Sequence, residues 1–272
     1  LEVNPKGGCV AAVELTHDGF CLEVFDISGK SVKQAELKTA DYEKIGYEIA
    51  DEIERLDGDC GRLLGICVGV PGVIDRKTKR VTSTIIPIDP DNNFFDVLCE
   101  RFPDLKIKLG NESSFCAYIE KTEHKRKIHS LVYIDINVGI GAGIILEDRI
   151  FTGAFGNAGE FGHVSVDING RPCKCGNRGC LEVMAGVPAI CETAGVKNIA
   201  EIDMNDGKTA EKLAPVCKYI ACGINNVINL INPEAVVIGG EITKLGEPFL
   251  EKLRGELKVI LSITDRERFS LS

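Results

Sequence analysis

The middle of the chain carries one histidine and three cysteines that are close enough in sequence to bind a single metal ion. His163, Cys173, Cys175 and Cys180 fall within eighteen residues, and glycines and a proline interrupt the stretch between them. An imidazole and three thiolates fill a tetrahedral zinc shell and leave no open position, which is typical of a structural site. The sequence therefore predicts a zinc-binding loop over residues 163–180 that organises the backbone around it.

The other nine cysteines stand singly in apolar or helical contexts, with no partner at metal-ligand spacing. We interpret them as small apolar core residues. A disulfide framework is typical of short secreted scaffolds, which a chain of 272 residues is not. These nine residues are Cys9, Cys21, Cys60, Cys67, Cys99, Cys116, Cys191, Cys217 and Cys222.

Composition excludes two classes of function for the chain as it stands. Its net charge is −9 and it has no long basic run, so it lacks the positive footprint that nucleic-acid phosphates need. No apolar run reaches the roughly 18 residues that span a bilayer. We expect a cytoplasmic protein that acts on a small molecule and does not enter a membrane.

Apolar periodicity predicts alternating strands and helices along the whole chain. Strands are expected at 9–14, 20–25, 31–37, 63–70, 105–109, 130–136, 144–146 and 235–238. Helices are expected at 41–56, 187–197, 209–231 and 247–256, and from a cap at Asn111 to about residue 120. The glycine-rich stretch 139–143 is predicted to be a turn.

The second half repeats the order of elements in the first, which favours an α/β protein with two lobes and a cleft between them. We expect an N-terminal lobe over residues 1–110 and a C-terminal lobe over 111–272 that carries the zinc loop.

The zinc stretch and the residues around it resemble the signature of the ROK family of sugar kinases and sugar-responsive repressors. The segment Gly153-Ala-Phe-Gly-Asn-Ala-Gly-Glu-Phe-Gly-His163 leads into the loop, and Cys180-Leu-Glu182 closes it. This signature is highly specific, whereas glycine turns alone would be weak evidence. The resemblance extends over most of the chain, through residues 70–75, 110–112, 139–143 and 236–240.

The resemblance implies the two-lobed, actin-like ATPase fold, also called ribonuclease H-like, with a zinc-binding loop. It implies that the histidine and three cysteines hold structural zinc and that His163 also faces a sugar. Carboxylates make charge-assisted hydrogen bonds to the vicinal hydroxyls of a sugar ring. The residues that the resemblance assigns to the sugar are Gly72, Asn111, Glu112, Glu160, His163 and Glu182.

The sequence departs from the family's kinases at three places where ATP chemistry is expected. The first phosphate turn, Glu14-Leu-Thr-His-Asp18, lacks a glycine and adds a negative charge. The second carries Asn137-Val138 where kinases offer Gly-Thr. Glu112 stands at the position of the catalytic aspartate and is at most a vestigial base, because its extra methylene shifts the carboxylate by roughly 1 Å. We therefore expect that ATP is not bound.

Together these features predict the sugar-binding domain of a ROK transcriptional repressor of the xylose-repressor type. Residues 1–8 resemble a segment that follows a DNA-binding domain in such repressors, so we expect an upstream winged-helix domain and a further closing helix after residue 272. DNA would be contacted only through that domain, in a homodimer or larger homo-oligomer. Two alternatives stay open, an ATP-dependent sugar kinase with divergent phosphate loops and a zinc-stabilised module without a ligand.

Overall fold

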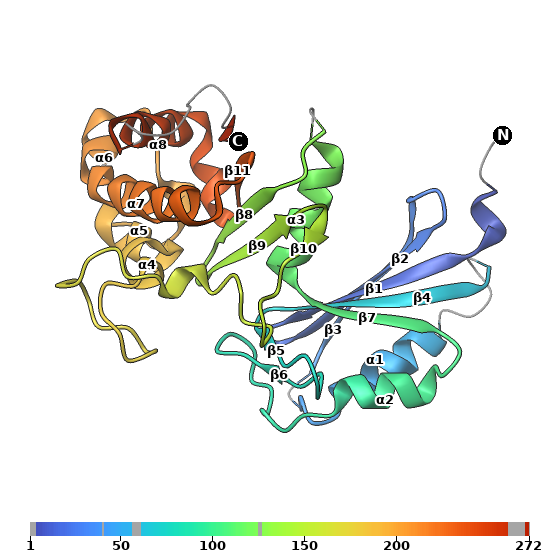
Figure 1. Ribbon diagram of the computed structural model, residues 1–272. Helices are drawn as coiled ribbons and strands as arrows, with labels where there is room; N and C mark the ends of the chain where they lie inside the picture. Colours follow the sequence, from blue (N-terminus) through green and yellow to red (C-terminus); the bar gives the residue numbers. More distant parts are fainter. Residues whose placement is uncertain (1–3, 40, 56–60, 125–126, 261–269, 272) are drawn as a thin grey trace. The chain divides into compact units, whose positions relative to one another are not determined.

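The structure is a computed structural model that describes residues 4–39, 41–55, 61–124, 127–260 and 270–271. It divides into two compact units, each built on a five-stranded sheet (Figure 1). Unit 1 comprises Leu1–Phe115 and Ala154–Asn157, and unit 2 comprises Cys116–Gly153 and Ala158–Ser272. The predicted end of the first helix at residue 56 lies outside the described residues.

The sheet of unit 1 has the strand order β3-β2-β1-β4-β7. Its first three strands form an antiparallel meander, and β4 and β7 run parallel to β1. Every second residue of β1 is buried, as expected for a strand with one face on a core. The strands are β1 (Cys9–Thr16), β2 (Gly19–Asp26), β3 (Ser31–Lys38), β4 (Leu63–Val70) and β7 (Lys106–Asn111).

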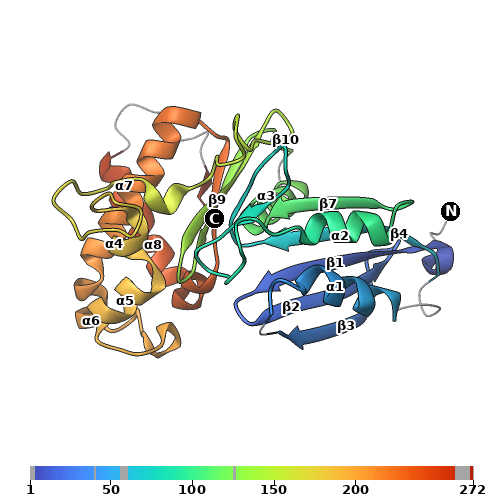
Figure 2. The same ribbon diagram turned by 90° about the horizontal axis from the view of Figure 1, so that it is seen from below.

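Two helices cover one face of this sheet, α1 (Ile45–Glu54) and α2 (Phe94–Arg101), as both ribbon views show (Figures 1 and 2). They approach closely because Gly46 has no side chain, and a Cβ there would lie 2.8 Å from the Cα of Phe94. The unit also contains η1 (Pro5–Gly7) and a small hairpin of β5 (Val73–Ile74) and β6 (Val81–Thr82). The short helix α2 was not predicted from the sequence.

The sheet of unit 2 has the strand order β10-β9-β8-β11-β12. Strand β8 pairs antiparallel with β9 and parallel with β11. The strands are β8 (Leu131–Ile136), β9 (Ile140–Leu146), β10 (Arg149–Ile150), β11 (Ala235–Gly239) and β12 (Ser270–Leu271).

The alternation of side chains along β8 divides the core of unit 2 between two faces. Val132, Ile134 and Ile136 belong to a large apolar cluster with helices that lie between β10 and β12 in the sequence. Leu131 and Tyr133 point the other way, into a smaller cluster with α3 (Glu112–Glu123). The helices are α4 (Leu181–Ala185), α5 (Val187–Ala194), α6 (Gly207–Lys212), α7 (Ala214–Ile231) and α8 (Gly246–Ile260), with short 3-10 turns η2 (Phe161–His163), η3 (Ile199–Glu201) and η4 (Glu241–Leu245).

The helix predicted over 209–231 is wrong in one respect, because the structure has two helices there. Leu213 both ends α6 and precedes α7, and Pro215 follows in the first turn of α7. Proline has no backbone N–H to donate, so it is favoured at a helix start and interrupts a longer helix.

The turn predicted over 139–143 is also wrong, because β9 already begins at Ile140. Gly141 and Gly143 lie within the strand, opposite Asp135 and Tyr133 of β8. Pairing with a buried neighbouring strand outweighs the weak preference of glycine for strands.

The interpretation of Cys9 as a free core thiol is wrong as well. Cys9 is buried, but it is disulfide-bonded. A disulfide depends on the distance between two sulfur atoms in space, which the separation of cysteines in the sequence does not reveal.

Candidate metal centre and sugar-binding residues

The predicted zinc ligands come together in unit 2. The ligand atoms of His163, Cys173, Cys175 and Cys180 all lie within 4.8 Å of one another. Nδ1 of His163 is 3.7 Å from Sγ of Cys173, and the sulfur atoms of Cys175 and Cys180 are 3.6 Å apart. A tetrahedral zinc shell has nitrogen–sulfur edges of about 3.5 Å and sulfur–sulfur edges of about 3.8 Å. The four side chains could therefore hold a metal ion with little movement.

Tight backbone geometry shapes the loop between the ligands. Isolated bridges join Ser165 to Cys180 and Pro172 to Arg178, so the loop folds back on itself. Gly179 has a φ of 59°, and a Cβ there would lie 1.6 Å from a carbonyl oxygen. Only glycine combines that conformation with such a close approach. The glycines that mark the signature are thus required by the loop itself.

The thiols of the cluster influence one another. Burial and the neighbouring thiols of Cys175 and Cys173 raise the pKa of Cys180 to about 12. The backbone N–H of Asn177 lowers the pKa of Cys175. Metal ligation requires thiolates, and a divalent cation offsets the repulsion between them. The donor set therefore suits a cation that prefers sulfur and imidazole.

Two further glycines press the segment before the loop against β9. A Cβ on Gly159 would lie 2.0 Å from the carbonyl oxygen of Ala142, and one on Gly162 would lie 2.4 Å from that of Ile140. The N–H of Ala142 also donates to the carbonyl of Gly159, at 2.8 Å. This contact fixes the backbone on both sides of Glu160.

Glu160 and Glu182 are brought close to the metal cluster. Oε2 of Glu160 lies 4.0 Å from Nε2 of His163. The pKa of Glu160 is raised overall. Burial and the negative charge of Glu182 raise it, and His163 lowers it. Glu182, in the first turn of α4, accepts a hydrogen bond of 3.3 Å from the backbone N–H of Ile140. Two carboxylates therefore lie near the His163 imidazole of the cluster, and their role in binding hydroxyl groups stays a prediction.

In unit 1 the structure brings Asn111 and Gly72 together. The amide nitrogen of Asn111 donates to the carbonyl of Gly72 at 3.0 Å, and its side-chain oxygen accepts from the N–H of Ser114 at 3.4 Å. Asn111 ends β7, and Glu112 begins α3. The role of Asn111 and Glu112 in sugar binding stays a prediction.

The need for glycine at position 72 has an internal explanation. A Cβ there would lie 2.5 Å from the carbonyl oxygen of Thr82 and 3.0 Å from the side chain of Ser83. The glycine allows the segment after β4 to pack against β6. Whether it also allows a sugar to approach the backbone stays a prediction.

Both segments that the resemblance assigns to phosphate turns are engaged in contacts within the protein. Asp18 forms an ion pair of 3.0 Å with Lys38, whose ammonium lowers the pKa of Asp18. The side-chain oxygen of Asn137 accepts a hydrogen bond of 2.7 Å from the backbone N–H of Glu241, at the start of η4. Val138, beside it, is 64% exposed.

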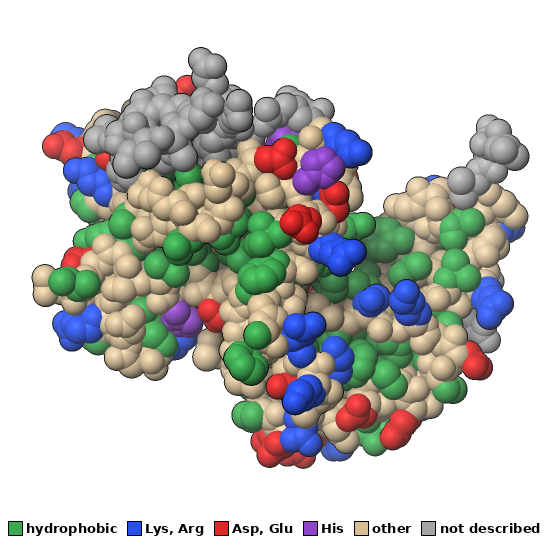
Figure 3. All heavy atoms as spheres, viewed as in Figure 1, with side chains coloured by type: hydrophobic (Ala, Val, Ile, Leu, Met, Phe, Trp, Pro, Cys, Tyr) green, Lys and Arg blue, Asp and Glu red, His purple; other side chains and the backbone are tan. Residues whose placement is uncertain are grey.

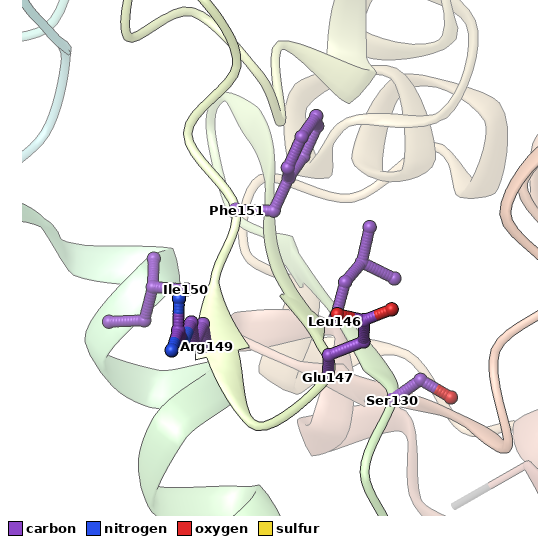
Figure 4. A pocket seen from close by; sticks show the side chains of 6 residues that line it. All are labelled: Ser130, Leu146, Glu147, Arg149, Ile150 and Phe151. Atoms are coloured by element: carbon purple, nitrogen blue, oxygen red, sulfur yellow. The ribbon is translucent and has the colours of Figure 1, made fainter.

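One contact within the site and one pocket outside it were missed from the sequence. Lys174, between two of the thiols, reaches Glu182, and a lysine within a metal motif was the only sequence signal for that contact. An open pocket of about 510 Å³ beside the β9–β10 hairpin contains none of the predicted residues (Figure 4). Its lining is Ser130, Leu146, Glu147, Arg149, Ile150 and Phe151.

Charged side chains of both signs are mixed on the surface. On the face shown in Figure 3, Lys and Arg side chains are interspersed with Asp and Glu. Among the described helices, none combines the length and the apolar character needed to cross a membrane.

Comparison with known proteins decides the family. The ROK family model matches residues 10–268. The chain belongs to the ROK family. It is 32% identical over 211 residues to the xylose repressor of Bacillus subtilis (strain 168), which covers 72% of this chain and 53% of that repressor. The chain thus spans about half the length of this relative.

The match to a kinase relative covers a larger share of that relative's length. The glucokinase of Halalkalibacterium halodurans is 27% identical over 273 residues, covering 84% of this chain and 82% of that enzyme. Among solved structures, a ROK family transcriptional regulator, a homolog of the E. coli MLC protein, superposes with a TM-score of 0.86 at 23% identity. That match covers 99% of this chain and 74% of the regulator. The predicted α/β fold of the ROK family is confirmed.

Proposed function

We propose that this ROK chain is the sugar-sensing part of a transcriptional repressor. The xylose repressor relative supports this class. The clustering of Glu160, His163 and Glu182 beside the candidate metal ligands supports a sugar as the ligand, because ionised carboxylates form strong hydrogen bonds to hydroxyl groups. We propose zinc as the metal and an organising role for it, since four protein ligands leave no open position.

The proposed sugar contacts come from both units. Gly72, Asn111 and Glu112 belong to unit 1, and the imidazole and two carboxylates beside the metal cluster belong to unit 2. A sugar that binds both sets shifts the equilibrium between arrangements of the units only if it binds one arrangement more tightly. A site that satisfies the hydroxyls of one sugar disfavours its epimers, because a misplaced hydroxyl leaves buried polar groups unpaired.

The observation that carries the choice of sensor over kinase is the chemistry of the phosphate turns. Kinases of the family present a hydroxyl where this chain has Val138. The side-chain oxygen of the neighbouring Asn137 accepts a hydrogen bond from the backbone N–H of Glu241. Asp18 places a carboxylate in the other turn. A carboxylate repels a triphosphate, and a valine side chain cannot donate to one. These features support a protein that kept sugar recognition without phosphoryl transfer.

In the whole protein, we propose that sugar binding changes the DNA affinity of an attached DNA-binding domain within a homodimer or larger homo-oligomer in the cytoplasm. The sugar signal would reach DNA through a change in the arrangement of the sensing units, because effector and DNA would bind at separate sites whose affinities are linked.

One alternative is a sugar kinase. The glucokinase relative, which matches over most of its length, favours it. Glu112 could still accept a proton from a sugar hydroxyl, although its carboxylate is displaced by roughly 1 Å from where an aspartate would place it.

Isothermal calorimetry with D-xylose, D-glucose and D-glucosamine tests the sensor proposal. We expect saturable binding of at least one of these sugars by the metal-loaded protein, with no requirement for nucleotide. The same sugar should raise the thermal midpoint, because a ligand that binds only the folded state stabilises it. A protein that binds no sugar in either measurement would instead favour a metal-stabilised module without a ligand.

A further inference from the structure

Glu182 has two partners in the structure, one on each carboxylate oxygen. Oε2 accepts from the backbone N–H of Ile140 at 3.3 Å, and Oε1 lies 3.4 Å from Nζ of Lys174. The Glu182 side chain is only 15% exposed, whereas that of Lys174 is 51% exposed. A mostly buried carboxylate with a second carboxylate near it, that of Glu160, is costly unless a cation accompanies it.

Lys174 is placed by the metal loop. It stands between Cys173 and Cys175, both members of the ligand cluster. Hydrogen bonds fix the backbone on either side of it. The N–H of Cys173 donates to the carbonyl of Asn177 at 2.8 Å, and the N–H of Gly176 donates to the carbonyl of Cys173 at 3.0 Å. A metal that holds the two thiols would therefore hold the base of the lysine side chain as well.

We propose that Lys174 is a positioning residue that links the metal loop to the sugar-binding carboxylate Glu182, and that it biases the site toward uncharged sugars. The inference rests on the proposed function. Lys174 fixes the direction in which Glu182 offers its oxygens to hydroxyl groups. It also balances one of the two negative charges. The site therefore attracts the protonated amine of an amino sugar less strongly than two carboxylates without a lysine would.

The replacement Lys174→Met tests this with a side chain of similar length and no charge. We expect the affinity for the neutral sugar bound by the wild type to fall about threefold to fivefold, the upper part of the range expected for a half-exposed ion pair. The ratio of D-glucosamine to D-glucose affinity should rise, at a pH where the amine is protonated. Lys174→Arg should restore both quantities to within about twofold, and Lys208→Met, an exposed lysine on α6, should change neither.

Zinc content and the Ile140 amide separate this inference from the proposed function. We expect Lys174→Met to keep one equivalent of zinc and to shift the NMR resonance of the Ile140 N–H, which Lys208→Met should leave in place. An unchanged Ile140 resonance overturns the inference, whether or not any sugar binds. Loss of zinc in Lys174→Met also overturns it, since the lysine would then support the metal and not Glu182. The inference is likewise overturned if Lys174→Met leaves both the sugar affinity and the ratio of D-glucosamine to D-glucose affinity unchanged. Failure of the wild type to bind sugar refutes the proposed function and with it the sugar preference, whereas the Ile140 resonance still tests the link between Lys174 and Glu182.

Discussion

Nδ1 of His163 lies 3.7 Å from Sγ of Cys173, so the imidazole belongs to the candidate metal shell. Its other nitrogen, Nε2, faces Oε2 of Glu160 at 4.0 Å. When one ring nitrogen binds a metal, the orientation of the whole ring is set, and with it the group that the second nitrogen meets. Metal binding and sugar binding should therefore be lost together.

Replacing Cys175 by Ser tests this link. Serine is a poor zinc ligand, so we expect loss of zinc, a fall in the free energy of unfolding on the order of 3 kcal/mol, and weaker sugar binding. Metal analysis, urea unfolding and calorimetry measure the three effects. Cys99→Ser, which changes an exposed thiol on α2, is the matched control and should leave all three unchanged. Wild-type sugar affinity in a zinc-free Cys175→Ser protein would refute the organising role of the metal.

Asn111 is expected to matter for stability as well as for the sugar. In Asn111→Ala the carbonyl of Gly72 loses a donor and the N–H of Ser114 loses an acceptor. We expect the free energy of unfolding to fall by about 1–2 kcal/mol. Asn111→Asp should recover part of this loss, because it keeps the acceptor for Ser114 but cannot donate to Gly72. Equal unfolding midpoints for Asn111→Ala and the wild type would show that these hydrogen bonds do not stabilise unit 1.

Gly72→Ala should destabilise the protein without any ligand present. Its Cβ would meet the carbonyl oxygen of Thr82 at 2.5 Å, a backbone atom that cannot rotate away. We expect a loss of about 1–3 kcal/mol in urea unfolding. The control Gly255→Ala lies in α8 with no atom within 4 Å of the new Cβ and should stabilise by about 0.5–1 kcal/mol. A neutral Gly72→Ala would show that packing does not require the glycine.

Asp148 should make part of the stability of unit 2 depend on pH. Lys121 and His129 lower the pKa of its carboxyl from 3.8 to about 2. Because the folded pKa is depressed, the stabilisation is complete above the pKa of the unfolded carboxyl and is lost as the pH falls through the folded value. Asp148→Asn should therefore be less stable than the wild type at neutral pH, and the difference should vanish as the pH falls below about 2.

Urea midpoints measured across that pH range check this prediction. Asp104→Asn, at an exposed carboxyl in unit 1, serves as the control and should show no such convergence. A stability difference between Asp148→Asn and the wild type that is the same at neutral and at acid pH would contradict the role of the carboxylate charge.

Most strands could be predicted because apolar alternation or a continuous apolar run marks them in the sequence. Residues 63–70 were predicted as a strand, and β4 occupies the same bounds, Leu63–Val70. Predictions failed where tertiary contacts outweigh local preference. The glycines at the start of β9 are strand residues because β8 pairs with them, and α2 is only eight residues long, too short to show a clear period.

The candidate metal ligands could be predicted because their spacing alone identifies them. Contacts that depend on the direction of a side chain could not be predicted. Asn137 accepts a hydrogen bond from the N–H of Glu241, 104 residues away in the sequence, and the contact of Lys174 with Glu182 depends on the direction that the metal loop gives the lysine side chain. Sequence spacing carries no information about such contacts, whereas it does identify ligands that lie within one loop.

The most direct test of the account is a coupled assay for ATP-dependent phosphorylation, with saturating ATP and the sugar that calorimetry identifies. The account predicts sugar binding and no turnover above that of a Glu112→Gln control, because the phosphate turns at Asp18 and Val138 do not suit a triphosphate. Robust turnover that Glu112→Gln abolishes would contradict it and would show a working sugar kinase.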